Sequence, residues 1–401
     1  MIIEILLALI VGILAGCFTG LMPGIHINLI ASLLLVSLGF LSGIPPIALA
    51  VFIVSMSITH TFIDFIPSIF LGAPEEDTFL SILPGHKMLK QGHGFQAVVF
   101  TLYGSLFALP IIIIFTPLFI FFLPNLFNYI KLSIPFILLF ISTYSILREK
   151  NILLSLIVFL LSGFLGFASF NLPIKDPLLP LLSGLFGFSS LIISLKNKTK
   201  IKKQIISPIS KIRMKKSEFL KALSASLFSA PLCSFLPGIS SGHAALIGSE
   251  IIPQKNKGFL FLTGSINTII MALSFVTLYS IKKSRSGSAV AIQEILNQVT
   301  LQHLVIIISS SIIAGIISFF IGIKLARLFA LYLNKINYKK LTIFVMLFLL
   351  AINIIFSNFL GVLIFITSSA LGIFTILSNS RRINMMGALI IPVIIYYLTF
   401  P

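Results

Sequence analysis

Two short segments interrupt apolar runs with a similar pattern, and each could bind an anion. Residues 21–28 read Leu-Met-Pro-Gly-Ile-His-Ile-Asn, and residues 236–243 read Leu-Pro-Gly-Ile-Ser-Ser-Gly-His. Proline removes a helix hydrogen bond and glycine loosens the backbone, so each segment should end one helix and begin another. The free amides and positive dipole end of a new helix attract anions. We therefore predict substrate-binding roles for Pro23, Gly24, Ile25, His26, Asn28, Pro237, Gly238, Ser240, Ser241, Gly242 and His243.

Helix capping is the alternative role for these polar side chains. Asn and Ser are common N-caps, and a histidine can satisfy a buried carbonyl group. For a single copy, capping is the simpler explanation. Two matched copies favour a binding site, because irregular backbone at membrane depth is tolerated only inside protein or beside a watery cavity.

A cluster of carboxylates points to ion coupling. Glu75, Glu76 and Asp77 are adjacent in a chain that has only 10 Asp and Glu residues, and Asp64 precedes them. Oxygen ligands suit hard cations, and carboxylates buried in a membrane can relay protons. We predict that Asp64, Glu75, Glu76 and Asp77 are ion-coupling residues for Na⁺ or H⁺, and that the protein needs no cofactor. A solvated loop apex is the alternative for the triplet.

Two polar residues in the second half join the candidate substrate site. Asn267 lies within an expected apolar helix, and Arg285 lies in a short basic stretch with Lys282 and Lys283. Asn267 offers a hydrogen-bonding amide, and the basic stretch could bind an anion. A positive anchor at the membrane interface explains Arg285 equally well.

A metal site is a less favoured hypothesis. His60 and Asp64 are four residues apart and would share a helix face, while His86 and His93 follow the acidic cluster. His and carboxylate ligands can hold a catalytic metal, so a membrane-embedded metal-dependent hydrolase is an alternative. The sequence has no H-E-x-x-H motif and no paired cysteine ligands, and we expect neither a metal nor an enzyme.

Composition places the protein in a membrane. With 58% hydrophobic and 9% charged residues, the chain has too little polar surface for a soluble globule, so we expect a multi-pass protein of the cell membrane. The net charge of +18 does not indicate nucleic-acid binding, because the basic residues lie in short loops that mark the cytoplasmic side. Cys17 and Cys233 occupy matching places before the two breaks, and buried free thiols are a better explanation than a disulfide.

These features require an all-α architecture of two pseudo-symmetric repeats. We expect the repeats to be inverted, with discontinuous or re-entrant helices and about ten to twelve membrane segments. Residues 1–195 form the first repeat, 196–216 a basic cytoplasmic linker and 217–401 the second repeat. Spans are expected at 5–20, 27–41, 46–62, 95–124, 132–147, 152–170, 178–195, 220–235, 244–252, 258–281, 304–329, 341–356, 360–377 and 386–400.

The Gly- and Pro-rich stretch 64–94 could be a re-entrant hairpin or an extramembrane loop. Residues 72–74 read Gly-Ala-Pro, and residues 84–92 read Pro-Gly-His-Lys-Met-Leu-Lys-Gln-Gly. Together they resemble a segment of the large membrane subunit of tripartite tricarboxylate transporters, which ends in D-G-x-P-M-x-K-x-G. Both breaks resemble that family's repeated L-P-G-x-G motif. Residues 264–267 and 285–288 occupy the order of its A-A-N-N-A and P-G-S segments.

The resemblance implies a permease that moves small organic anions under an ion gradient. Members of this family usually work with a small membrane subunit and an extracytoplasmic solute-binding protein. Glu75, Glu76 and Asp77 replace the small residues of the family pattern, and they would repel an anion unless protonated or paired with cations. The substrate could therefore be another anion, a zwitterion or a lipid headgroup. Within transport, the alternative function is translocation of a phosphorylated lipid such as polyprenyl phosphate.

Overall fold

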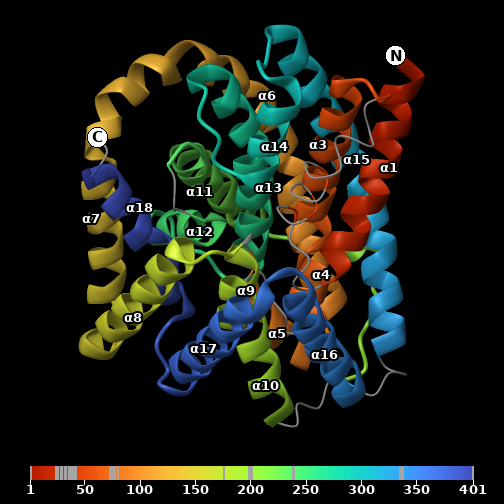
Figure 1. Ribbon diagram of the computed structural model, residues 1–401. Coiled ribbons are helices and arrows are strands. Elements are labelled where there is room, and N and C mark those ends of the chain that lie inside the picture. Colours follow the sequence, from red (N-terminus) through yellow and green to blue (C-terminus); the bar gives the residue numbers. More distant parts are fainter. Residues whose placement is uncertain are drawn as a thin grey trace.

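The chain folds into a bundle of helices, shown by a computed structural model (Figure 1). The structure describes residues 2–22, 27, 30, 34, 43–71, 78, 81–174, 177–196, 202–236, 240–333 and 338–399. These residues form helices, turns and loops, and no strand occurs among them. The predicted all-α class is confirmed.

The first half contains nine α-helices in its described part, joined by short 3₁₀ and π turns. They are α1 (Ile2–Leu21), α3 (Pro46–Ile63), α4 (Phe65–Leu71), α5 (Ile82–Lys90), α6 (Gly94–Ile130), α7 (Ile134–Leu147), α8 (Ile152–Asn171), and α9 (Leu178–Leu182), which continues through a π-helical turn (Ser183–Phe188) into α10 (Ser189–Lys196).

The second half follows a similar order. Its helices are α11 (Lys216–Ser234), α12 (Ser241–Ile251), α13 (Asn256–Ile281), α14 (Gly287–Leu296), α15 (Leu301–Leu333), α16 (Tyr338–Phe356), α17 (Asn358–Leu377), the 3₁₀ turn η6 (Arg382–Met386) and α18 (Gly387–Thr399). Within the described ranges, nine helical segments are long and apolar enough to cross a membrane, and three shorter apolar helices accompany them. The protein is thus a multi-pass membrane protein.

Helices α3 and α13 form the centre of the bundle. Nearly all of their side chains are buried, including polar ones that water would otherwise solvate. Helix α3 packs against α1 and against α15 of the other half, and α13 packs against α11 and against α6 of the other half. Each central helix therefore pairs with the long helix of the opposite half, as a two-fold repeat requires. That the repeats are inverted stays a prediction.

Close backbone approach holds α6 and α13 together. A Cβ atom at Gly104 would overlap the carbonyl oxygen of Phe261, and one at Gly264 would overlap that of Thr101. Small residues let membrane helices approach closely, so that dispersion forces and weak hydrogen bonds stabilise the pair. The two glycines therefore fix the contact between the halves.

Helix α6 is longer than the predicted span 95–124. It contains Pro110, Pro117 and Pro124, yet it continues to Ile130. Proline bends a helix, and the second half of α6 arches towards α7 at the top of Figure 1. In a membrane a bent but continuous helix is more stable than an interrupted one, because lipid cannot satisfy free backbone groups.

Most of the described residues in the stretch 64–94 are helical, in α4 and α5. Helix α4 is entirely buried and continues the span of α3 after a turn at Asp64. An extramembrane loop is therefore wrong for residues 65–71. Residues 72–77, which include the three predicted coupling carboxylates, lie outside the described residues.

The basic linker packs against the first half where it is described. The backbone N–H of Gly94 donates to Oε1 of Gln204 across 2.8 Å, and that of Ile205 donates to the carbonyl of Gly92 across 2.8 Å. Gln204 is buried, whereas Arg213 and other basic side chains are exposed. Both cysteines are free, as predicted.

Candidate substrate site

Helices α11 and α12 form a re-entrant hairpin. Gly248 of α12 lies against Ser229 and Ala225 of α11, and Gly258 at the start of α13 lies beside Glu218 at the start of α11. The chain therefore returns to the end from which it started. With a rise of 1.5 Å per residue, α12 is about 16 Å long, half of a ~30 Å apolar core. The predicted break lies at the tip of this hairpin.

The first turn of α12 brings two predicted residues together at the tip. The backbone N–H of Ser240 donates to Nδ1 of His243 across 3.4 Å, and the Ser240 hydroxyl lies 3.2 Å from the same nitrogen. Both residues are buried, as are Ser241 and Gly242. Because Nδ1 accepts, a neutral His243 carries its proton on Nε2 and can donate it to a ligand. The Nδ1 atom of His243 therefore takes part in capping α12, and its Nε2–H is the group that would donate to a ligand.

Arg285 adds a positive charge to this tip. It precedes α14, which begins after the N-cap Ser286, whose hydroxyl accepts from the backbone N–H of Ala289 across 3.2 Å. The charge of Arg285 acts on the imidazole of His243 and on the thiol of Cys233. Two residues predicted from separate sequence segments are therefore close enough to interact electrostatically, and the positive charge favours an anion.

Two further predicted residues, which the sequence assigns to different roles, form a pair between the two central helices. Nδ2 of Asn267 donates to Oδ2 of Asp64 across 2.8 Å, and both side chains are buried with 3% exposed surface. Asp64 sits at the turn between α3 and α4, and Asn267 lies in the middle of α13. A carboxylate at membrane depth usually has a functional role, since its ionised form is costly there.

Sequence reasoning missed a seam of buried hydroxyls that continues from this pair along α3. The hydroxyl oxygens of Thr61 and Thr268 are 3.1 Å apart, and those of Ser57 and Ser288 are 2.8 Å apart. The Ser318 hydroxyl donates to that of Thr59 across 2.8 Å. Ser or Thr at alternate positions from 55 to 61 in an apolar helix was the available signal.

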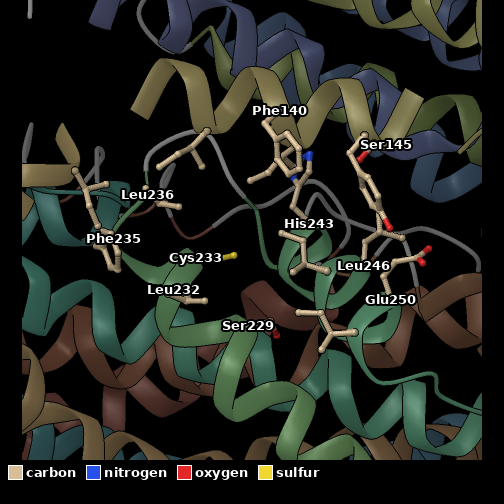
Figure 2. A pocket seen from close by; sticks show the side chains of 16 residues that line it. Phe140, Ser145, Ser229, Leu232, Cys233, Phe235, Leu236, His243, Leu246 and Glu250 are labelled. Atoms are coloured by element: carbon tan, nitrogen blue, oxygen red, sulfur yellow. The ribbon is translucent and has the colours of Figure 1, made fainter. Parts of the chain in front are cut away.

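A cavity of about 410 Å³ lies beside the hairpin (Figure 2). Its wall combines α7, α11 and α12, and most of the lining side chains are apolar, such as Phe140, Leu232 and Leu236. His243 lines it near the tip, and Glu250 lines it further along α12. The volume suits a small ligand.

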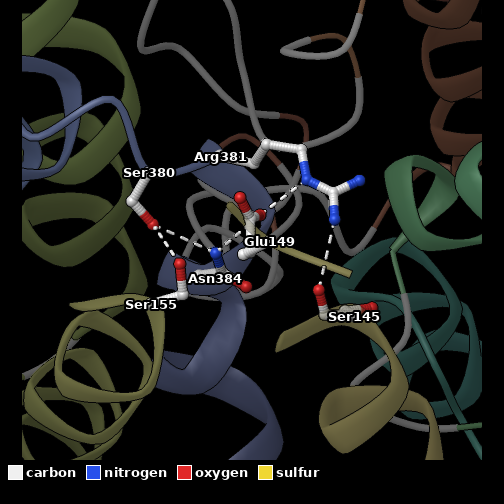
Figure 3. A network of polar contacts seen from close by, with 6 residues as sticks. All are labelled: Ser145, Glu149, Ser155, Ser380, Arg381 and Asn384. Carbon is white, nitrogen blue, oxygen red and sulfur yellow. Dashed lines mark hydrogen bonds and ion pairs between the residues drawn. The ribbon is translucent and has the colours of Figure 1, made fainter. Parts of the chain in front are cut away.

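Ion pairs beside this cavity join the two halves. Arg148 pairs with Glu250, and Nε of Arg381 donates to Oε1 of Glu149 across 2.6 Å. Asn384 donates to the same Glu149 oxygen across 3.0 Å (Figure 3). The two basic segments around residues 148–150 and 381–382 are therefore neighbours. Sequence reasoning did not identify these partners.

The metal hypothesis lacks a ligand cluster. No group of three His, Cys, Asp or Glu side chains in the described part of the chain is placed to hold a metal. Nδ1 of His60 lies 3.0 Å from the Thr19 hydroxyl, and Asp64 faces Asn267 instead. Burial, then the charges of Lys90 and Arg382, lower the pKa of His86 to about 4. Cations beside His86 would repel a metal ion.

Some predicted site residues cannot be placed. Pro23, Gly24, Ile25, His26, Asn28, Pro237 and Gly238 lie outside the described residues, together with Glu75, Glu76 and Asp77. The site that the structure describes is therefore the second-half hairpin tip with Arg285, and the Asp64–Asn267 pair.

Comparison with known proteins identifies the family. The family model described as "Tripartite tricarboxylate transporter TctA family" matches residues 6–387. The chain is 33% identical over 416 aligned residues to the uncharacterized protein MJ1079 of Methanocaldococcus jannaschii. The alignment covers 98% of this chain and 99% of that protein. No solved structure matches. The predicted resemblance is confirmed, and an enzyme is excluded because this is a transporter family. The chain belongs to the TctA family of tripartite tricarboxylate transporters.

Proposed function

We propose that this permease moves a small organic anion such as a carboxylate, and that an ion gradient drives the movement. The observation that carries the proposal is the capped, buried first turn of α12 at His243, on which the charge of Arg285 acts. A guanidinium binds a carboxylate through two parallel hydrogen bonds, and the Nε2–H of His243 supplies another donor. The positive dipole end of α12 adds to the attraction.

The first Pro-Gly break supplies the second arm of this site in our proposal. Its residues 23–28 have the same pattern as the α11–α12 tip, and paired half-helices of this kind hold substrates in other transporters. Backbone amides and the side chains of His26 and Asn28 would then contact the far end of the anion.

Coupling to Na⁺ or H⁺ rests on Asp64. Its carboxylate is buried beside an amide donor at a helix turn, where a protonation or a cation would change the balance of charge. The entering cation would offset the cost of the buried Asp64 carboxylate. Ion entry would then change the net charge of the site and so favour the binding of an anion. Glu75, Glu76 and Asp77 remain candidates for the same role.

Uptake into proteoliposomes tests the proposal. The purified chain would be reconstituted and offered radiolabelled di- and tricarboxylates, with and without an imposed Na⁺ or pH gradient. We expect gradient-dependent accumulation of at least one carboxylate in wild type and its loss in Arg285→Gln. Lys283→Gln is the matched control, because Lys283 belongs to the same segment but lies over the rings of Phe127 and Tyr397.

We also infer a role for accessory subunits, since the family is tripartite. A small membrane subunit and a solute-binding protein would deliver the anion from outside. If so, the reconstituted chain alone transports slowly, and addition of the partners raises the rate.

Translocation of a phosphorylated lipid is the second candidate. The apolar cavity beside His243 supports it, because an isoprenoid chain could lie against Phe140 and Leu232 while a phosphate approached the tip. A fluorescent polyprenyl phosphate placed in one leaflet of the same proteoliposomes distinguishes the two. Transfer of this lipid without carboxylate uptake would replace our first proposal.

A further inference from the structure

A second cavity, of about 360 Å³, lies where the linker meets α6, α11 and α13. Five aromatic side chains form most of its wall: Phe100, Tyr103, Phe107, Phe219 and Phe261. The ring centroids of Phe107 and Phe219 are 4.9 Å apart, and those of Phe219 and Phe261 are 5.3 Å apart. Phe107, Phe219 and Phe261 therefore form one packed cluster, and we call the cavity that the five side chains line the aromatic groove.

Cations surround the aromatic groove. Arg213 and Lys216 line it directly, and Nζ of Lys257 lies 5.5 Å from the ring centroid of Phe100. All three basic residues are exposed. No carboxylate belongs to the described lining, and Glu218 in the first turn of α11 is not part of it.

The groove lies at the basic end of the molecule. The linker leads into α11 there, and α13 begins at the same end, since Gly258 lies beside Glu218. Clustered Lys and Arg mark the cytoplasmic side, whose lipid leaflet carries a negative surface potential. Lipid acyl chains fill an apolar groove at the bilayer surface, and the three cations at its rim favour a lipid with a negatively charged headgroup.

We propose that the aromatic groove binds one anionic phospholipid. The acyl chain lies against Tyr103, Phe107 and Phe219, the three rings that keep exposed surface, and the headgroup phosphate lies between Arg213, Lys216 and Lys257. This site is separate from the substrate site, so it does not depend on the transported solute. It ties the linker between the halves to the membrane surface.

The absence of tryptophan from the chain gives a direct test. The full-length Phe107→Trp variant carries a single tryptophan at the groove, and bromine atoms on an acyl chain quench its fluorescence on contact. The protein is reconstituted in phosphatidylcholine vesicles with a small fraction of either brominated phosphatidylglycerol or brominated phosphatidylcholine. We expect stronger quenching by the anionic lipid at equal mole fraction.

Control variants separate the groove from general lipid contact. Phe164→Trp places the reporter on α8 at a side chain that is 67% exposed, and there we expect equal quenching by both lipids. In the Phe107→Trp background, Lys257→Gln with Lys216→Gln should remove most of the preference, because each cation contributes up to about a fivefold change in local lipid concentration. Tyr103→Trp repeats the measurement if Phe107→Trp does not fold.

Three results would overturn the proposal. Equal quenching by the two lipids at the groove would show an apolar surface without headgroup selection. A preference that survives the loss of Lys216 and Lys257 would place the anionic lipid elsewhere. Loss of the preference on adding inorganic phosphate at constant ionic strength would show a site for free phosphate instead of a phospholipid.

Discussion

The side-chain amide of Asn267 donates a hydrogen bond to the carboxylate of Asp64 across 2.8 Å. These residues are 203 positions apart, and their contact joins α13 of the second half to the α3–α4 turn of the first. The pair therefore links the two halves of the chain at a buried polar point. If Asp64 couples transport to an ion, a change in its charge alters the hydrogen bond to Asn267 and so affects the packing of both halves.

Removing the charge of Asp64 should uncouple transport. Asp64→Asn keeps the shape of the side chain but cannot bind a proton or Na⁺ in the same way, so we expect gradient-driven accumulation to fall about tenfold or more. Solute exchange across the membrane without a gradient should persist. Glu294→Gln removes an exposed carboxylate and serves as the control. Normal gradient dependence in Asp64→Asn would exclude Asp64 as the coupling residue.

The contact between Gly264 and Thr101 predicts a strong size limit. Gly264→Ala places a methyl group against a backbone carbonyl that has no room to move, so we expect a loss of about 1–3 kcal/mol in the free energy of unfolding. Gly43 has no neighbouring atom within 4 Å of an added Cβ, and Gly43→Ala is the matched control. Thermal unfolding in detergent measures both. Equal melting temperatures would mean that α6 and α13 are not closely packed.

The two ion pairs at residues 148 and 149 should differ in strength. Arg381→Gln leaves the Glu149 carboxylate, whose side chain is only 7% exposed, without its cation, and we expect a loss of about 1–3 kcal/mol. Arg148→Gln should change the stability little, because the Arg148 side chain is 51% exposed and solvent screens its pair. Denaturant titration of both variants checks this order, and the reverse order would contradict it.

Acid should destabilise the protein through His86. Burial, then Lys90 and Arg382, lower the pKa of His86 from 6.5 to about 4, so the unfolded chain binds this proton more readily than the folded one. The contribution to stability is complete above about pH 6.5 and declines as the pH falls towards 4. At pH 5 the loss is about 1–2 kcal/mol.

The His86→Gln variant tests this pH dependence. Its melting temperature should fall less than that of wild type between pH 7.5 and pH 5. His303→Gln, at the start of α15, should keep the wild-type fall. If all three proteins respond alike to acid, His86 is not the titrating group.

The sequence predicts the long spans well and the short elements poorly. The expected spans 152–170 and 258–281 agree with α8 and α13, because about 20 continuous apolar residues leave little alternative in a membrane. Helix α14 was missed, since it has ten residues and follows a polar stretch that resembles a loop. The three prolines of α6 suggested an early end, but a bent helix keeps more backbone hydrogen bonds.

The candidate site was predicted in its parts but not in its arrangement. The pattern of Pro, Gly and Ser predicted the break between α11 and α12, and His243 and Arg285 were both named from their residue types. Their relative placement depends on how α14 packs against α3 and α13, which no local pattern encodes. The same applies to Asp64 with Asn267 and to Glu149 with Arg381, which join distant segments.

Equilibrium binding of a radiolabelled carboxylate to the purified chain tests the central claim most directly. The claim is that Arg285 and His243 hold the anion at the tip of the re-entrant hairpin. We expect Arg285→Gln to weaken binding about 10- to 100-fold, as the loss of a charge-assisted hydrogen bond predicts, Arg285→Lys to weaken it less, and Lys283→Gln to leave it unchanged. Unchanged affinity in Arg285→Gln, or equal loss in Arg285→Gln and Lys283→Gln, would contradict the account.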